Sequence, residues 1–515
     1  MMRIPVVFTA LVALAHQAPA RVPPDLSGIA QFWQIESSLA SDTEPPAAAW
    51  MIAAYPDEAE RLSDSVGKAL PIEGRPLGMY IARAIGRQLG DRAFAAIAGD
   101  PVGYMRAYER AADAPGCGCV PLSASAMRAI DALRGHTPDG PVLPQLPAPT
   151  GVNIVGTVVS YRTDASRRST EFPRGRPITL QVWYPAASAK SSRAPYLVEQ
   201  GLDLSLLRQQ YFGGDSSLVD VWRTLATHSS LNAPVASGKH PLVLFSVGLG
   251  TIRASYTSLT EDLASHGYIV VLVEGALQGF MRLPDGREVS DTAGVYGTPE
   301  GHLRGVRDWA RDVSWTLDVM AHAQDAALAS IARAVDWSRI GATGHSSGGI
   351  VALAACEQDR RIRACLDLDG GIAGPVGEPM ADFVTHGLTK HAMILRSQPL
   401  YDDTTFARRK MTRAEWEKRG ELARAAFDSL VSRSHVRPGV AFIAGTGHAS
   451  FSDAPFVMPT SITRFGGRII APQRGFEIIS ALVHAFFDEA LSNEAGAFAA
   501  TARRFSEVTV ARPSR

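Results

Sequence analysis

The sequence lacks several features that would place it in a special class. Its 515 residues include only four cysteines, too few for a scaffold built on disulfides. Lys plus Arg and Asp plus Glu number 51 each, so no net charge attracts a polyanion, and nucleic acid is not expected as a partner. There is no internal repeat, heptad run or low-complexity tract. What remains is a globular protein, for which 46% hydrophobic and 20% charged residues are ordinary values.

The first twenty residues have the pattern of a signal peptide. Arg3 supplies the positive charge, residues 4–15 are largely apolar, and Ala18-Pro19-Ala20 offers small residues for cleavage. Twelve apolar residues are too few to cross about 30 Å of hydrocarbon, and no later stretch approaches the roughly 20 that a spanning helix needs. We therefore expect a mature chain that begins near Arg21, has no transmembrane span, and is periplasmic or secreted.

The four cysteines fall into two pairs. Cys117 and Cys119 lie in Gly-Cys-Gly-Cys, which is too little by itself for a four-ligand zinc site. Cys356 and Cys365 fall in a predicted apolar helix and a predicted strand, so buried inert thiols are the preferred interpretation. The sequence leaves open whether either pair forms a disulfide.

Composition divides the rest of the chain into parts. Residues 21–136 are predicted to form a helical N-terminal region, because alanine-rich segments carry apolar residues at spacings of three and four. Residues 137–150 contain five prolines and are predicted to be a stiff linker. Residues 151–492 are expected to form the main domain, and residues 493–515 a C-terminal tail.

Short apolar runs alternate with amphipathic helices after residue 151, which is typical of a mostly parallel sheet covered by helices. The predicted strands are 178–184, 242–246, 268–273, 340–343, 364–368, 393–396 and 440–444. The predicted helices are 256–266, 302–323, 347–357, 412–432 and 475–491, of which 412–432 could belong to a cap over a site. The predicted fold class is α/β.

The segment Gly344-His345-Ser346-Ser347-Gly348-Gly349 carries the strongest chemical signal. It directly follows the predicted strand 340–343 and directly precedes an apolar helix. A G-x-S-x-G sequence in that setting forces its serine into a strained turn at the carboxyl edge of the sheet. Side chains two residues either way would collide in so tight a bend, which explains the glycines. Ser346 is therefore predicted to be a nucleophile.

A serine nucleophile needs a base, and the base needs an acceptor on its other ring nitrogen. His448 follows the last predicted strand, 440–444, and of the thirteen histidines only this one has that setting. His345, inside the turn, is expected to flank the site and not to relay the proton. The histidines at 302, 322 and 484 lie within helical patterns and are expected to have packing or surface roles.

The acid of the triad has more than one candidate. Asp369 follows the next strand after the nucleophile, whereas Asp402 or Asp403 follows the strand after that. Asp367 could share the face of Asp369, but it lies within the strand. Periodicity alone does not choose among them.

Two backbone N–H groups are needed to stabilise an oxyanion. One is expected at Ser347, the residue after the nucleophile. For the second we choose Leu249, because the loop Ser246-Val247-Gly248-Leu249-Gly250 follows an early strand and its glycines allow close backbone approach.

Several segments together resemble the type II platelet-activating-factor acetylhydrolases, a family that includes the lipoprotein-associated phospholipases A2. The resemblance covers about residues 150–490. Besides the serine turn, the segments that carry it are Leu180-Gln181-Val182-Trp183-Tyr184-Pro185, His240-Pro241-Leu242-Val243-Leu244-Phe245-Ser246 with Gly248-Leu249-Gly250, Leu263-Ala264-Ser265-His266-Gly267-Tyr268-Ile269-Val270, Leu368-Asp369-Gly370 and Gly447-His448-Ala449-Ser450-Phe451-Ser452-Asp453.

The resemblance implies an α/β-hydrolase fold and a metal-independent Ser-Asp-His mechanism, so neither a cofactor nor a metal is expected. It implies that Ser346 is the nucleophile, that His448 is the base, and that the acid is Asp369. The N–H groups of Leu249 and Ser347 would form the oxyanion hole.

The chain departs from the family at four positions around the expected pocket mouth. Where the family commonly has His, an aromatic residue, His and Trp, this chain has Val247, Ser347, Gly275 and Gly371. Reaction type is therefore better supported than phospholipid specificity. Nothing comparable covers the N-terminal 130 residues.

The leading hypothesis is an exported serine hydrolase that cleaves short-acyl carboxylic esters, with platelet-activating-factor-like phospholipids as one substrate. The partner would be a small-molecule or lipid ester. One alternative keeps the triad but cleaves an amide or a polyester. Another is a catalytically idle scaffold that binds a partner or the cell envelope. The intact Ser, Asp and His argue against this second alternative.

Overall fold

The structure of the chain is a computed structural model. It describes residues 146–189, 193–198, 222, 225–291, 294–373, 378–399, 406, 412–457, 470–492 and 494–511. Almost all of these belong to one compact unit, made of residues 146–204, 226–454 and 465–515. The predicted signal peptide, the predicted helical N-terminal region, Cys117 and Cys119 lie outside the described residues, as does the linker up to residue 145.

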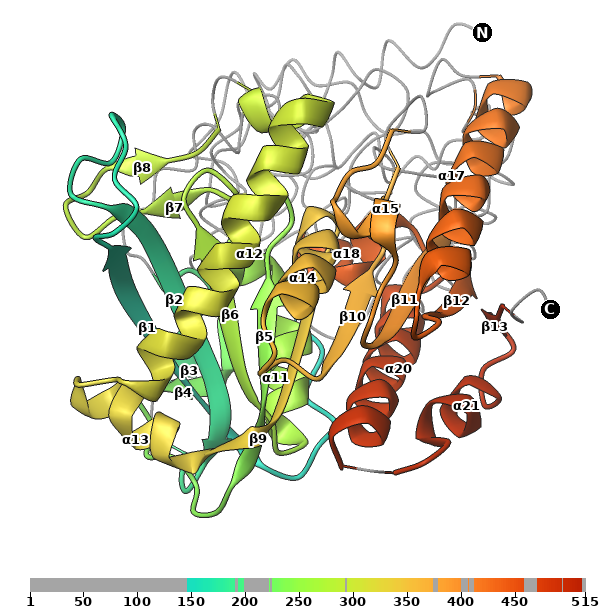
Figure 1. Cartoon of the computed structure of the whole chain (residues 1–515). Coiled ribbons are helices and arrows are strands. Elements are labelled where there is room, and N and C mark those ends of the chain that lie inside the picture. The colour runs from blue at the N-terminus through green and yellow to red at the C-terminus, as the bar shows by residue number, and fades with distance from the viewer. Residues whose placement is uncertain are drawn as a thin grey trace, which may run out of the picture. The chain divides into compact units, whose positions relative to one another are not determined.

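An eleven-stranded sheet runs through this unit, with the strand order β13-β12-β11-β10-β9-β5-β6-β2-β1-β4-β3 (Figure 1). Its strands are β1 (Ile154–Asp164), β2 (Arg176–Ala186), β3 (Arg193–Pro195), β4 (Ala226–Leu231), β5 (His240–Ser246), β6 (Ile269–Gly275), β9 (Val335–His345), β10 (Ala364–Leu368), β11 (His391–Gln398), β12 (Gly439–Ala444) and β13 (Val508–Val510). The strands β7 (Met281–Arg282) and β8 (Glu288–Val289) form a separate small sheet.

The direction and order of the strands position the site. From β6 through β12 all neighbouring strands are parallel, whereas β2 is antiparallel to both β6 and β1. The chain passes from β5 to β6 on one side and then returns to β9 on the other side of β5. Ligands bind at such a switch point in open α/β sheets, because the loops after the two strands separate there. This architecture confirms the predicted α/β-hydrolase fold.

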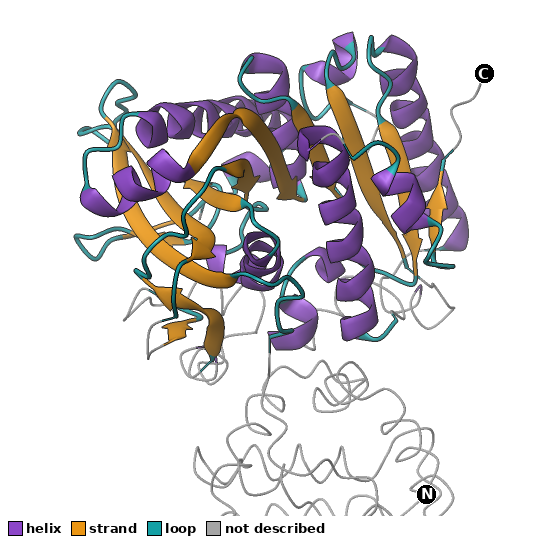
Figure 2. Ribbon diagram, turned by 90° about the horizontal axis from the view of Figure 1, so that it is seen from below, coloured by secondary structure: helices purple, strands orange, loops and turns teal. Residues whose placement is uncertain are grey.

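Helices cover both faces of the sheet (Figures 1 and 2). The described helices are η2 (Arg253–Tyr256), α11 (Thr257–Ser265), η3 (Val295–Gly297), α12 (Pro299–Ala321), α13 (Ala326–Ala334), α14 (Ser347–Gln358), α15 (Phe383–His386), α17 (Arg413–Arg433), η4 (His448–Phe451), α18 (Ala454–Val457), α20 (Pro472–Ser492) and α21 (Ala497–Ala502). No described helix has the length and the apolar character needed to cross a bilayer.

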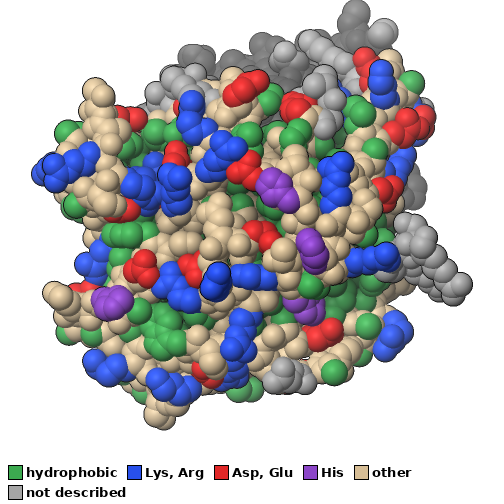
Figure 3. All heavy atoms as spheres, viewed as in Figure 1, with side chains coloured by type: hydrophobic (Ala, Val, Ile, Leu, Met, Phe, Trp, Pro, Cys, Tyr) green, Lys and Arg blue, Asp and Glu red, His purple; other side chains and the backbone are tan. Residues whose placement is uncertain are grey.

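The hydrophobic core has two layers because side chains alternate along each strand. Leu242 and Leu244 of β5 pack with α12 and α14, whereas Val243 and Phe245 pack with α11 and α20 on the other face. Strands β2, β5, β6 and β10 are buried almost throughout, as expected for strands covered on both sides. On the surface seen in Figure 3, basic and acidic side chains are interspersed.

Capping residues explain where two helices begin. The Thr298 side chain accepts a hydrogen bond from the Gly301 N–H at 3.1 Å, and Pro299 occupies the first position of α12. Thr412 and Glu415 form a capping box at the start of α17. The predicted helices 302–323 and 412–432 correspond to these two.

The tail predicted after residue 492 requires a correction. Residues 497–502 form α21, and β13 pairs with β12 in antiparallel register, with Ile443 opposite Val508. Phe498 and Phe505 are buried in the core layer on the side of α20. This segment is therefore part of the hydrolase unit, at least as far as residue 511.

The interpretation of Cys356 and Cys365 as inert thiols was wrong. The structure joins them in a disulfide with a Cα–Cα distance of 6.3 Å. Cys356 lies in the last turn of α14 and Cys365 in β10, so the bond ties the helix after the candidate nucleophile to the neighbouring strand.

Candidate active site

Ser346 lies at a sharp turn between β9 and α14. Its backbone has φ 59° and ψ −127°, a conformation that L-residues rarely adopt. The turn is held by the Ser346 N–H, which donates to the Leu368 carbonyl at 2.9 Å, and by the Ser346 carbonyl, which accepts from the Gly349 N–H at 3.0 Å. These bonds fix a strained serine at the carboxyl end of β9.

The glycines of the turn are required by close backbone contacts. A Cβ at Gly344 would lie 2.4 Å from the Gly348 carbonyl oxygen, and a Cβ at Gly348 would lie 2.1 Å from the Ser246 carbonyl oxygen. Because the obstructing atoms belong to the backbone, they cannot move aside as a flexible side chain can. The turn is therefore packed directly against the end of β5.

Gly348→Ala should destabilise the fold by about 1–3 kcal/mol, the usual cost of overpacking. Urea unfolding of the variant would show this as a lower midpoint. Gly297→Ala is the matched control, because nothing lies within 4 Å of a Cβ at that position. Equal midpoints for the two variants would show that the turn has room for a side chain.

The structure brings Ser346, His448 and Asp369 together. His448 starts η4 just after β12, and Asp369 directly follows β10. The Nε2 atom of His448 lies 3.0 Å from Ser346 Oγ, and its Nδ1 atom lies 2.7 Å from Asp369 Oδ2. Because a carboxylate only accepts, Nδ1 carries the proton and Nε2 keeps a lone pair for the serine hydroxyl.

Asp369 is buried and firmly held. Its Oδ1 atom accepts from the Ser397 N–H and its Oδ2 atom from the Ser397 hydroxyl, both at 2.8 Å. The Arg396 guanidinium lies 3.6 Å from Oδ1. Burial opposes ionisation, but the Arg396 charge and the His448 hydrogen bond outweigh it and hold the pKa of Asp369 well below its usual range. The residue is therefore a carboxylate throughout the neutral pH range.

The other candidate acids differ in their placement. Asp367 is buried within β10, where its Oδ1 atom accepts from the Gly370 N–H at 2.8 Å, and burial raises its pKa to about 8. Within the described residues it makes no hydrogen bond to His448. Asp402 and Asp403 lie outside the described residues.

The two predicted oxyanion donors lie at the ends of β5 and β9. Ser347 is the first residue of α14, and Leu249 lies in the loop after β5. Among the described residues, neither N–H donates a backbone hydrogen bond. The Gly250 N–H donates to the Gln278 carbonyl at 2.7 Å, which holds the loop.

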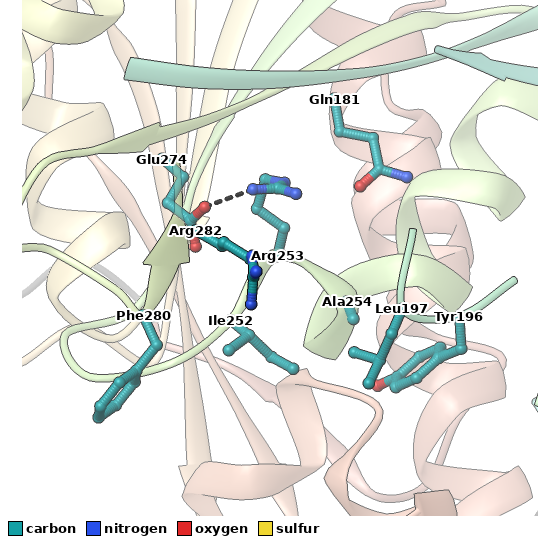
Figure 4. Close-up of a pocket in the computed structure, with 9 residues that line it drawn as sticks. All are labelled: Gln181, Tyr196, Leu197, Ile252, Arg253, Ala254, Glu274, Phe280 and Arg282. Atoms are coloured by element: carbon teal, nitrogen blue, oxygen red, sulfur yellow. Dashed lines mark hydrogen bonds and ion pairs between the residues drawn. The ribbon is translucent and has the colours of Figure 1, made fainter. Parts of the chain in front are cut away.

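A small pocket adjoins the continuation of this loop (Figure 4). In it Arg253, from η2, points toward Glu274, from the end of β6, and their Nη1 and Oε2 atoms are 2.5 Å apart. Both side chains are buried. Burial raises the pKa of Glu274, and the charge of Arg253 acts in the opposite direction. The ion pair ties the segment after Leu249 to the sheet.

The sequence did not predict a hydrogen-bond chain that links the oxyanion loop to the His448 loop. Gly248 N–H donates to the Tyr256 hydroxyl at 2.9 Å, and that hydroxyl lies 3.1 Å from His345 Nδ1. His345 Nε2 then donates to the His448 carbonyl at 2.9 Å. Tyr256 lies between a strand and a helix, and its position in the sequence does not indicate that it contacts His345. Sequence reasoning therefore missed it. His345 flanks the site, as its position in the turn suggested.

Neutral His345 should make the fold sensitive to acid. Burial, followed by the nearby His448, lowers the pKa of His345 to about 3, whereas an unfolded histidine titrates near 6.5. Between these values the unfolded chain binds more protons, so the free energy of unfolding falls as the pH falls from about 6.5 to about 3. The lost stability should approach roughly 5 kcal/mol.

Urea unfolding at several pH values would test this effect by comparing wild type with His345→Gln. The stability difference between wild type and variant should shrink on acidification in that window. Exposed His322 provides the control substitution, His322→Gln, which should leave the profile unchanged. Parallel profiles for wild type and His345→Gln would contradict the assignment.

A buried ion pair explains one of the four departures from the resembled family. A Cβ at Gly275 would lie 1.9 Å from Asp312 Oδ2. That oxygen is 2.8 Å from the Arg176 Nη2 atom, and both side chains are buried. The space that a histidine would need at position 275 is therefore filled by a charged pair.

Comparison with family models supports the resemblance. The model for "Platelet-activating factor acetylhydrolase, isoform II" matches residues 146–276 and 316–498, more than half of the chain. These segments contain Ser346, Asp369 and His448. A model for acetyl xylan esterase matches residues 222–368.

The individual relatives match this chain at low sequence identity and over only part of their length. Platelet-activating factor acetylhydrolase from Bos taurus is 29% identical over 229 residues, which are 39% of this chain and 51% of the relative. The dog enzyme is 28% identical over 171 residues, 28% of this chain and 38% of the relative. A "Probable 1-alkyl-2-acetylglycerophosphocholine esterase" from Arthroderma benhamiae is 26% identical over 267 residues, 49% of this chain and 60% of the relative. Each match spans less than two thirds of the relative.

Among solved structures, a ferulic acid esterase from Streptomyces cinnamoneus has a similar fold. The TM-score is 0.56 at 25% sequence identity, and the match covers 72% of this chain and 99% of the other. The shared architecture extends over nearly all of that esterase.

Proposed function

The chain belongs to the platelet-activating factor acetylhydrolase isoform II family, and from this premise we propose that it is a serine hydrolase that cleaves carboxylic esters. The observation that carries the proposal is the continuous contact from Ser346 Oγ to His448 and from His448 to Asp369, at 3.0 and 2.7 Å. A strained serine at a strand-to-helix turn, with a base and a buried carboxylate aligned behind it, suits nucleophilic attack on an acyl group.

In the proposed reaction, Ser346 Oγ attacks the ester carbonyl while His448 Nε2 takes the hydroxyl proton. Asp369 stabilises the resulting imidazolium, and the N–H groups of Leu249 and Ser347 hold the oxyanion. His448 then gives the proton to the departing alcohol, which leaves an acyl group on Ser346. Water, activated by the same histidine, releases the acid and restores the serine.

The proposed acyl group is short. The names of the relatives and of the acetyl xylan esterase family have an acetyl ester in common, on a phospholipid or on xylan. The alcohol part is less constrained, because Val247, Gly275 and Gly371 differ from the residues usual in the family. Platelet-activating-factor-like phospholipids are therefore one proposed substrate within a class of short-acyl esters.

A series of p-nitrophenyl esters tests the acyl preference. We expect kcat/KM to fall at least about tenfold from acetyl to octanoyl, because a short-acyl pocket has no room for the added methylenes. Short-chain phospholipids would follow, to examine the alcohol part. A rate that rises with chain length would point to a lipase-like pocket and contradict the short-acyl proposal.

We also propose that residues 1–20 direct export, so that the mature protein is periplasmic or secreted. In this scheme residues 21–136 form a separate helical region, and the proline-rich linker predicted at residues 137–150 connects it to the hydrolase domain, whose compact unit already includes residues 146–150. The apolar stretch with a small-residue cleavage site supports the first point, and the five prolines support the second.

A further inference from the structure

We propose that Asp262, His266 and His484 form a binding site for a divalent transition-metal ion such as Zn²⁺, away from the candidate active site. Asp262 lies on α11, His266 directly follows that helix, and His484 lies on α20. His266 precedes β6 and therefore lies near the amino ends of the parallel strands. The candidate catalytic residues follow the carboxyl ends, so this is a second location on the sheet.

Two buried atoms in this cluster lie within ion-pair distance of each other but outside hydrogen-bond alignment. Asp262 Oδ2 and His484 Nε2 are 3.1 Å apart, and their side chains are 0% and 9% exposed. Within the described residues, neither atom has a hydrogen-bond partner. A protonated imidazole aimed at the carboxylate would satisfy both atoms, but the alignment is not that of a hydrogen bond. A carboxylate oxygen and an imidazole nitrogen that converge in this way could both coordinate one cation.

The third residue completes a ligand set of the right chemistry. The rings of His266 and His484 have centroids 3.9 Å apart, and ligand atoms of all three residues lie within 4.8 Å of one another. Imidazole nitrogens and a carboxylate oxygen bind Zn²⁺ at about 2.0–2.2 Å, which places neighbouring ligands about 3.4 Å apart in a tetrahedron. His266 lies at the surface, so its ring can shift toward the other two ligands without disturbing the core. Water would take the fourth position.

Thr150 supplies the outer support that metal ligands usually have. Its N–H and its hydroxyl donate to Asp262 Oδ1 at 2.6 and 2.9 Å, and the same hydroxyl oxygen lies 2.9 Å from His266 Nε2. The carboxylate is thus fixed through Oδ1, and Oδ2 is left for the ion. A bound metal would tie the start of the hydrolase unit to α11 and α20, which is a structural role.

Isothermal titration calorimetry of Zn²⁺ binding to the tag-free full chain tests the proposal. We expect one equivalent at this site, and an affinity at least tenfold lower for His266→Gln, whose exposed position spares the core. His322→Gln, an exposed histidine elsewhere, is the matched control and should bind as wild type does. The titration should be run in a Cys117→Ser/Cys119→Ser background, because those thiols could bind zinc independently.

Thermal unfolding gives a second readout. Zn²⁺ should raise the Tm of wild type and of His322→Gln but not of His266→Gln, because an ion that binds the folded state stabilises it. Absence of one tight equivalent, or equal affinity in His266→Gln and wild type, would overturn the proposal. Ester hydrolysis at constant temperature should be unaffected by EDTA, so the metal site and the proposed hydrolase activity can fail independently.

Discussion

Replacement of Ser346 by alanine is expected to lower kcat for ester hydrolysis by about 10⁵ to 10⁶ fold. The variant loses the atom that forms the acyl-enzyme, while His448 and Asp369 keep their positions. What remains is the modest acceleration that an oxyanion hole and substrate binding provide by themselves. The loss would be measured from initial rates with p-nitrophenyl acetate. The enzyme concentration must be high enough to detect the residual activity.

The control for this experiment is Ser432→Ala, which removes an exposed hydroxyl on α17 that donates to the Ser429 carbonyl. It should retain the wild-type rate. A circular dichroism spectrum and an unfolding midpoint would establish that Ser346→Ala is folded. Near-normal hydrolysis by a folded Ser346→Ala would refute the assignment of the nucleophile.

Asp369→Asn should lower kcat by about 10⁴ fold, the effect seen when a triad acid becomes an amide. The asparagine can donate to His448 Nδ1, which shifts the histidine proton to Nε2. A protonated Nε2 cannot accept the Ser346 hydroxyl proton, so the base is lost although the geometry remains. The variant also gives up the carboxylate that stabilises the imidazolium.

The decisive comparison is Asp369→Asn against Asp402→Asn, because the sequence placed both acids after strands that follow the nucleophile. The hydrogen bond from His448 to Asp369 predicts that Asp402→Asn changes kcat by no more than a few fold. If Asp402→Asn alone abolishes hydrolysis, the acid has been assigned wrongly. Asp403→Asn belongs in the same series.

Much of the fold could be predicted because the parallel strands are covered on both faces. Such strands appear as short apolar runs, and the seven predicted ones correspond to β2, β5, β6, β9, β10, β11 and β12. Strand β1 was missed because its second half holds half-buried and exposed positions and so shows no continuous apolar run. Strand β13 has three residues, and only its pairing with β12 defines it.

The candidate site was predictable where the chemistry depends on local sequence. Ser346 and His448 each follow a strand directly, and a serine at a strained turn needs glycines that the sequence displays. Asp369 could be chosen only through family resemblance, because two strands in succession end near an aspartate. The disulfide and the Tyr256 to His345 contact depend on tertiary distances that spacing does not encode.

Labelling with a fluorophosphonate tests the central claim most directly, because the probe reacts only with a serine whose proton is removed by an aligned base. Intact-mass analysis of the wild-type chain should show one adduct, and peptide mapping should place it on Ser346. Ser346→Ala should remain unlabelled. An unlabelled wild type, or an adduct that persists in Ser346→Ala, would contradict the account.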